Sequence, residues 1–155
     1  MANTYSQIYI QIVFAVEARQ CLIRPQFREE VQKYATGIIT ERGQKLLAIY
    51  CMPDHTHLQV GLKPSIALSD LVHDVKKASS DFINRKRWFM GRFSWQEGFG
   101  AFSYGHSQFP GVIRYIQNQE MHHARCSFRD EYVRFLKKFE IAHDERFIFR
   151  DVEVA

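Results

Sequence analysis

The order in which strand-like and helix-like segments follow one another restricts the fold of this chain more than any single motif. Over residues 6–16, apolar side chains alternate with polar or aromatic ones, and this period of two predicts a strand with one buried face. The next segment opens at Arg24-Pro25, repeats apolar residues at helical spacing and ends at Gly43, which predicts a helix. A strand followed by a helix is therefore the first unit of the chain.

Five further elements are predicted from periodicity and capping residues. They are strands at 46–51 and 55–62, a helix at about 65–87 with Ser65 as its N-cap, a strand at 99–104, and a helix that Ser107 begins, with Pro110 in its first turn. A short helix near 130–139 and an ordered tail containing Phe147, Ile148 and Phe149 are expected to follow.

The resulting order of strand, helix, strand, strand, helix, strand, helix is that of a ferredoxin-like or RRM-like α+β fold. We expect an antiparallel sheet with helices packed on one face, followed by a C-terminal helix that carries Tyr115. This scaffold often binds single-stranded nucleic acid on its sheet. No repeat or linker divides the 155 residues, so a single domain over residues 1–155 is expected.

Composition limits the compartment and the class of partner. The three cysteines form no CxxC pair, and no apolar run is long enough to cross a bilayer. The N-terminus lacks the pattern of a secretory leader. We therefore expect a cytoplasmic protein that does not bind membranes. The net charge of +4 favours an anionic partner such as nucleic acid.

A His-Thr-His triplet lies at the start of the third predicted strand. His55 and His57 are two residues apart, so their imidazoles project from the same face and could converge on one metal ion, while Thr56 points to the other face. A structural or solvent-facing histidine pair is the alternative at this level, because a short motif of this kind also arises by chance.

A second candidate group lies on the last predicted helix. Tyr115 and Gln119 are four residues apart and share one helical face. His122 lies about one turn further along that face, whereas His123 is expected to be rotated away. For an arbitrary tyrosine, the alternative is an amphipathic side chain at the edge of a helix.

Basic residues lie along the second predicted helix and just after it, where they could contact a phosphate backbone. The candidates for DNA binding are Lys76, Lys77, Arg85, Lys86, Arg87 and Arg92. A solvated helix face is the alternative. Trp88 and Trp95 could stack on bases, but in a segment so rich in aromatic residues core packing is the expected role.

Together these motifs resemble the HUH single-tyrosine transposases. The resemblance rests on residues 52–57 (Met-Pro-Asp-His-Thr-His), on Tyr115-x-x-x-Gln119 within the longer string that ends at His122 and His123, and on residues 93–99 (Phe-Ser-Trp-Gln-Glu-Gly-Phe). It extends over almost the whole chain. Thr56 departs from the bulky hydrophobic residue that is usual between the two histidines, but a β-branched residue still suits a strand.

The resemblance implies a chemistry and a set of roles. His55, His57 and Gln119 would hold a divalent metal, Mg²⁺ or Mn²⁺, against the scissile phosphate of single-stranded DNA, and Tyr115 would attack the phosphorus. A 5′-phosphotyrosine intermediate would then be rejoined to another strand. The role of His122 is left open: the alternatives are contact with the scissile phosphate or the metal, support of the ligands, and a place on the helix surface. The expected partners are hairpin-bearing DNA ends and a second copy of the chain, with the tyrosine helix acting in cis or in trans.

Two other functions remain open from the residues alone. A domesticated, repeat-associated relative would cut hairpins without mobilising its own gene. A noncatalytic nucleic-acid-binding module would bind DNA without a divalent metal and would form no covalent adduct. The presence of His55, His57, Tyr115 and Gln119 together argues against the module.

Overall fold

A computed structural model of the chain describes residues 3–124, 126–144, 146 and 148. Its centre is a four-stranded antiparallel sheet with the order β2-β3-β1-β4. The strands are β1 (Tyr9–Ala15), β2 (Lys45–Cys51), β3 (His55–Gly61) and β4 (Gly100–Tyr104). The predicted ferredoxin-like α+β fold is confirmed.

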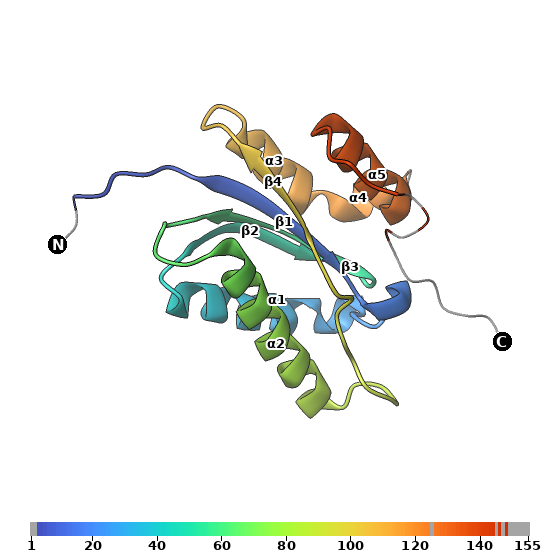
Figure 1. Cartoon of the computed structure of the whole chain (residues 1–155). Helices are drawn as coiled ribbons and strands as arrows, with labels where there is room; N and C mark the ends of the chain where they lie inside the picture. The colour runs from blue at the N-terminus through green and yellow to red at the C-terminus, as the bar shows by residue number, and fades with distance from the viewer. Residues whose placement is uncertain (1–2, 125, 145, 147, 149–155) are drawn as a thin grey trace.

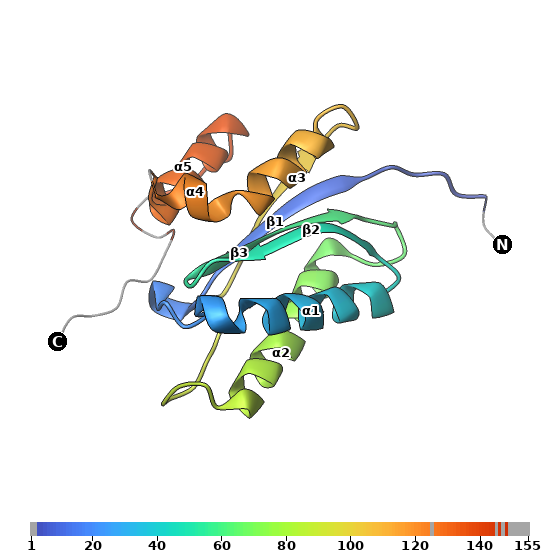
Figure 2. The same ribbon diagram turned by 180° about the vertical axis from the view of Figure 1, so that it is seen from behind.

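Helices cover both faces of this sheet (Figures 1 and 2). On one side lie α1 (Pro25–Glu41) and α2 (Leu68–Lys86), and on the other lie α3 (Phe109–Gln117), α4 (Gln119–His123) and α5 (Phe128–Lys138). A short 3-10 helix, Glu17–Arg19, follows β1. The second layer of helices encloses the face of the sheet on which His55 and His57 project.

The alternation of side chains in β1 sends apolar groups into two separate cores. Ile12 and Phe14 pack with α1 and α2, whereas Val13 and Ala15 pack with Phe128 on α5. The expectation that only one face of this strand is buried was therefore wrong. It failed because the C-terminal helices cover the second face, and strand periodicity does not reveal what packs above a sheet.

Two predicted helix starts differ from the structure. Ala67, not Ser65, is the N-cap of α2, and the Ser65 hydroxyl instead accepts a hydrogen bond from Gln44 Nε2 at 3.3 Å. Gln108, not Ser107, is the N-cap of α3, and its side chain accepts a hydrogen bond from the Gly105 amide. Neither N-cap residue makes a side-chain capping hydrogen bond. The preference for serine at N-caps therefore could not locate the start of either helix.

The aromatic segment before β4 packs into the core, as predicted. Trp95 donates a hydrogen bond from Nε1 to Ser79 at 2.9 Å and packs edge-on against Phe14. The Trp88 ring stacks on Phe27 with a centroid distance of 4.2 Å. Of the predicted tail, Ile148 packs against the core beside α5, while Phe147 and Phe149 lie outside the described residues.

Two glycines in different environments, Gly100 on β4 and Gly37 on α1, test how closely β4 packs against α5. A methyl group on Gly100 would stand 2.8 Å from the Tyr132 hydroxyl and 3.2 Å from the Phe102 ring. We expect Gly100→Ala to lower the free energy of unfolding by about 1–3 kcal/mol in urea titrations because of this overpacking. Gly37 lies in α1 with nothing within 4 Å, so Gly37→Ala should raise it by about 0.5–1 kcal/mol. Equal effects at both positions would contradict the close approach at Gly100.

Candidate active site

Strand β3 places two imidazoles side by side beneath the C-terminal helices. His55 and His57 are 1% and 0% exposed, and their ring centroids are 5.2 Å apart. His55 Nδ1 donates to the Asp54 carboxylate at 2.7 Å, which leaves Nε2 free to bind a cation. Burial lowers the pKa of His55 to about 4, so the ring is neutral at neutral pH, as a metal ligand must be.

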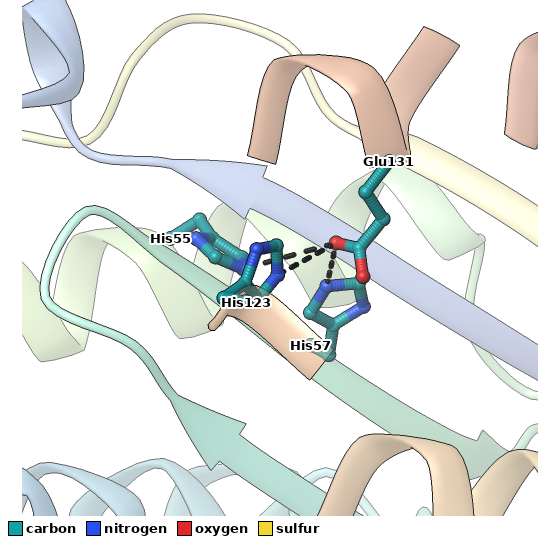
Figure 3. A group of neighbouring side chains, drawn as sticks. All are labelled: His55, His57, His123 and Glu131. Carbon is teal, nitrogen blue, oxygen red and sulfur yellow. Dashed lines mark hydrogen bonds and ion pairs between the residues drawn. The ribbon is translucent and has the colours of Figure 1, made fainter. Parts of the chain in front are cut away.

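Glu131, in the first turn of α5, brings a carboxylate into the same place (Figure 3). Its Oε1 lies 2.7 Å from His57 Nε2, 3.2 Å from His123 Nε2 and 3.9 Å from His55 Nε2. The side chain is 2% exposed. Burial alone would raise the pKa of Glu131, but the hydrogen bonds from His123 and His57 outweigh it and hold the pKa well below its usual range.

The predicted continuous helix from Tyr115 through Gln119 is interrupted. Helix α3 ends at Gln117 and α4 begins at Gln119, with Asn118 between them at φ −101° and ψ 25°. Gln119 nevertheless reaches the site, because its side-chain oxygen lies 3.0 Å from His123 Nε2 and 3.5 Å from His55 Nε2. Its amide nitrogen donates to the Tyr115 carbonyl oxygen at 3.3 Å.

This interruption corrects the predicted orientation of His123. Because Asn118 starts a new helix, the angular positions of later residues no longer follow from Tyr115, and His123 faces the cluster instead of being rotated away. Glu131 was missed as well. The weak signal available for it was an acidic residue in the first turn of a helix capped by Ser127, which did not indicate contact with residues more than seventy positions earlier.

The tyrosine hydroxyl lies at the edge of this cluster. Tyr115 donates a hydrogen bond to Glu131 Oε2 and lies 3.0 Å from His122 Nε2. Burial raises the pKa of Tyr115, and the negative charge of Glu131 raises it further, so the phenol is protonated at rest. His122 also lies 3.1 Å from Glu131 Oε2, beside the hydroxyl.

Four donor atoms of this cluster could surround one cation. The ligand atoms of His55, His57, His123 and Glu131 all lie within 4.8 Å of one another. In a tetrahedral site with bonds of about 2.1 Å the ligand atoms lie roughly 3.4 Å apart, so the side chains would have to draw closer around the ion. Three imidazole nitrogens and a carboxylate oxygen suit a transition metal better than Mg²⁺, which prefers oxygen ligands.

The predicted DNA-binding residues lie on the far side of the sheet from Tyr115, on α2 and the segment after it (Figure 1). Three of their cationic groups already have partners in the chain. Lys76 Nζ donates to the carbonyl oxygens of Gln96 and Gly98, and burial lowers its pKa to about 8. Ion pairs join Lys77 to Asp81 at 3.4 Å and Lys86 to Glu30 at 3.2 Å.

The remaining three lie together near the end of α2. Arg85, Arg87 and Arg92 line a shared hollow with Asn84 and Asp81. Arg85 Nη2 donates a long hydrogen bond of 3.5 Å to the Tyr34 hydroxyl.

Within the parts of the chain that the structure describes, no helix is long and apolar enough to cross a membrane.

Comparison with known proteins relates this arrangement to transposases. Residues 4–119 match the family described as IS200-like transposases. A candidate transposase from Deinococcus radiodurans R1 is 21% identical with a TM-score of 0.61, over 77% of this chain and 95% of that one. A REP-associated tyrosine transposase bound to a REP hairpin is 15% identical with a TM-score of 0.60, over 94% and 92% of the two chains. None of the curated proteins matches.

The two adjacent histidines of α4 test which side chains hold a cation. His123 contributes a donor atom to the cluster, whereas His122 contacts the tyrosine hydroxyl. We expect His123→Ala to weaken binding of Mn²⁺ or Co²⁺ by about tenfold or more in calorimetry, and His122→Ala to weaken it less, because His122 offers no donor atom and only supports the Glu131 carboxylate from 3.1 Å. Wild-type affinity in His123→Ala would show that His123 is not a ligand.

Proposed function

This chain belongs to the IS200-like transposase family, and we propose that it cleaves and rejoins single-stranded DNA through a phosphotyrosine bond at Tyr115. The resemblance to single-tyrosine transposases is confirmed by the family match. The observation that carries the proposal is the meeting of a tyrosine hydroxyl, two neighbouring strand histidines and a carboxylate in one buried cluster.

The reaction is a transesterification. The Tyr115 hydroxyl gives its proton to Glu131 or His122, the two groups that it contacts, as its oxygen attacks the scissile phosphorus. A phosphodiester to the tyrosine forms, the bond from phosphorus to the 3′-oxygen of the upstream nucleotide breaks, and that oxygen takes up a proton. A phenolate is a good leaving group, so a second 3′-hydroxyl can reverse the step and join the strands without ATP. Glu131 and His122 hold the hydroxyl in position before attack, which supports the assignment of Tyr115 as the nucleophile.

A divalent cation is part of the proposal. His55, His57 and Gln119 are the ligands that the family resemblance implies, and the position of His123 and Glu131 supports adding both. A bound divalent cation would neutralise charge on the scissile phosphate and orient it toward the tyrosine. Of the two expected ions, the imidazole-rich donor set favours Mn²⁺ over Mg²⁺.

The proposed substrate is single-stranded DNA whose ends carry hairpins. Support comes from the structural neighbour that is bound to a REP hairpin. We assign Arg85, Arg87 and Arg92 to DNA remote from the cleaved bond, since they lie across the sheet from Tyr115. The other three basic residues, Lys76, Lys77 and Lys86, already have partners in the chain. Titrating a labelled hairpin against a variant with Arg87 and Arg92 both changed to Gln measures this contribution.

A repeat-associated, domesticated enzyme is the second candidate function. The likeness to a REP-associated transposase over 94% of this chain favours it. Both candidates use the same chemistry at the same residues. They differ in the DNA that flanks the gene, where isolated hairpin repeats favour the domesticated enzyme and complete element ends favour a mobile one.

The nucleophile can be tested by trapping the covalent adduct. Full-length protein mixed with labelled single strands from the DNA flanking its gene should give a metal-dependent adduct on a denaturing gel. Tyr115→Phe should abolish the adduct, because the attacking oxygen is missing. Tyr34→Phe, a tyrosine on α1, is the matched control and should retain it. Tight binding by the wild type with neither adduct nor cleavage would instead identify a noncatalytic binding module.

The expected homodimer raises the question of which chain supplies the tyrosine. Helix α3 packs on its own sheet, where Ile116 is buried against Ala48, so we propose that Tyr115 acts in cis. Mixing Tyr115→Phe with His57→Ala should then leave both chains inactive. Recovery of adduct formation on mixing would establish a dimer that works in trans.

A further inference from the structure

A groove leads to the tyrosine between α3 and α5. It encloses about 510 Å³ and runs over Tyr104 and Phe135 to Tyr115 and Glu131. A second hollow of about 490 Å³ continues past the tyrosine toward His122. Tyr115 and Arg134 line both hollows, so the two hollows adjoin at these side chains.

The walls of the first hollow combine apolar surface with positive charge. Val112, Pro110 and Phe135 contribute apolar surface, and Arg114, Arg134 and Lys138 contribute the cations. All three cationic side chains are exposed. The volume is within the range of sites that hold a nucleotide-sized ligand.

The cations of this groove differ from those of α2 in their partners. Among the described residues, Arg114, Arg134 and Lys138 form no ion pair with a carboxylate. Arg134 donates to the Cys126 sulfur at 3.4 Å, and the Lys138 ammonium lies 5.7 Å from the centre of the Tyr104 ring. Exposed cations without acidic partners can bind phosphate without first breaking an ion pair within the chain.

We propose that the strand to be cleaved lies in this α3–α5 groove. Arg114, Arg134 and Lys138 bind its phosphates, and the apolar wall receives a base. The strand then passes Tyr115 and continues into the second hollow, which presents a phosphate to the tyrosine. This assignment rests on the proposed cleavage of single-stranded DNA and adds the path of the substrate to it.

Binding can be measured separately from cleavage. The protein is full-length Tyr115→Phe with chelator, and the probe is a fluorescent unstructured single strand followed by anisotropy at several salt concentrations. Adding Arg134→Gln and Lys138→Gln should weaken binding at least about tenfold and reduce the salt slope by about 1.4, since each lost phosphate contact removes about 0.7. Lys33→Gln with Lys45→Gln removes the same charge elsewhere and should change neither value by more than about twofold.

A neutral block of the groove tests its location. Gly111 lines the hollow on α3, and a Cβ there has only Arg114 within 4 Å, at 3.8 Å. Gly111→Leu should weaken binding of the strand about tenfold without loss of stability. Gly37→Leu, an exposed glycine on α1, is the matched control and should bind normally.

The outcomes separate this proposal from the function on which it rests. Binding that is weakened in the groove variants but not in the controls supports the groove, even when wild-type protein forms no adduct. Equal binding by groove and control variants overturns it, even when Tyr115 is the nucleophile. Absence of any binding to the unstructured strand overturns it too.

Discussion

The buried carboxylate of Glu131 holds the C-terminal part of the protein onto the sheet. Taking a carboxylate out of water costs several kcal/mol unless its oxygens find strong partners. Here one oxygen faces imidazoles from β3 and α4, and the other faces a phenol and a further imidazole. The three elements α3, α4 and α5 therefore meet at one side chain, and the position of the Tyr115 hydroxyl depends on that meeting.

The same contacts explain why the site is preorganised. Asp54 orients His55 through Nδ1, and Gln11 contacts His57 Nδ1 at 3.0 Å, so each strand imidazole is held from behind. Gln11 is itself held by the Tyr104 hydroxyl at 3.1 Å. Each ring thus presents Nε2 to the cluster with little freedom to turn away, which limits the reorganisation needed when a cation or a phosphate enters.

Much of the fold follows from local patterns, but the site follows only in part. Apolar side chains repeat with a period of two in the strands and of about 3.6 in the long helices, and these repeats predict the elements. His55 and His57 share a face for the same local reason. The orientation of His123 depends on the break at Asn118, which nothing in the helical pattern indicates. The contact of Glu131 with His57 joins residues 74 positions apart, and only the packing of α5 on the sheet brings it about.

The family match ends at residue 119, whereas His123 and Glu131, which complete the cluster, lie after that point. A polypeptide shortened to its family-like part would keep Tyr115 and both strand histidines. It would lose Glu131, which accepts the hydrogen bond from the tyrosine hydroxyl, and the α5 side of the α3–α5 groove. The smallest unit that could retain the complete cluster therefore has to include α5.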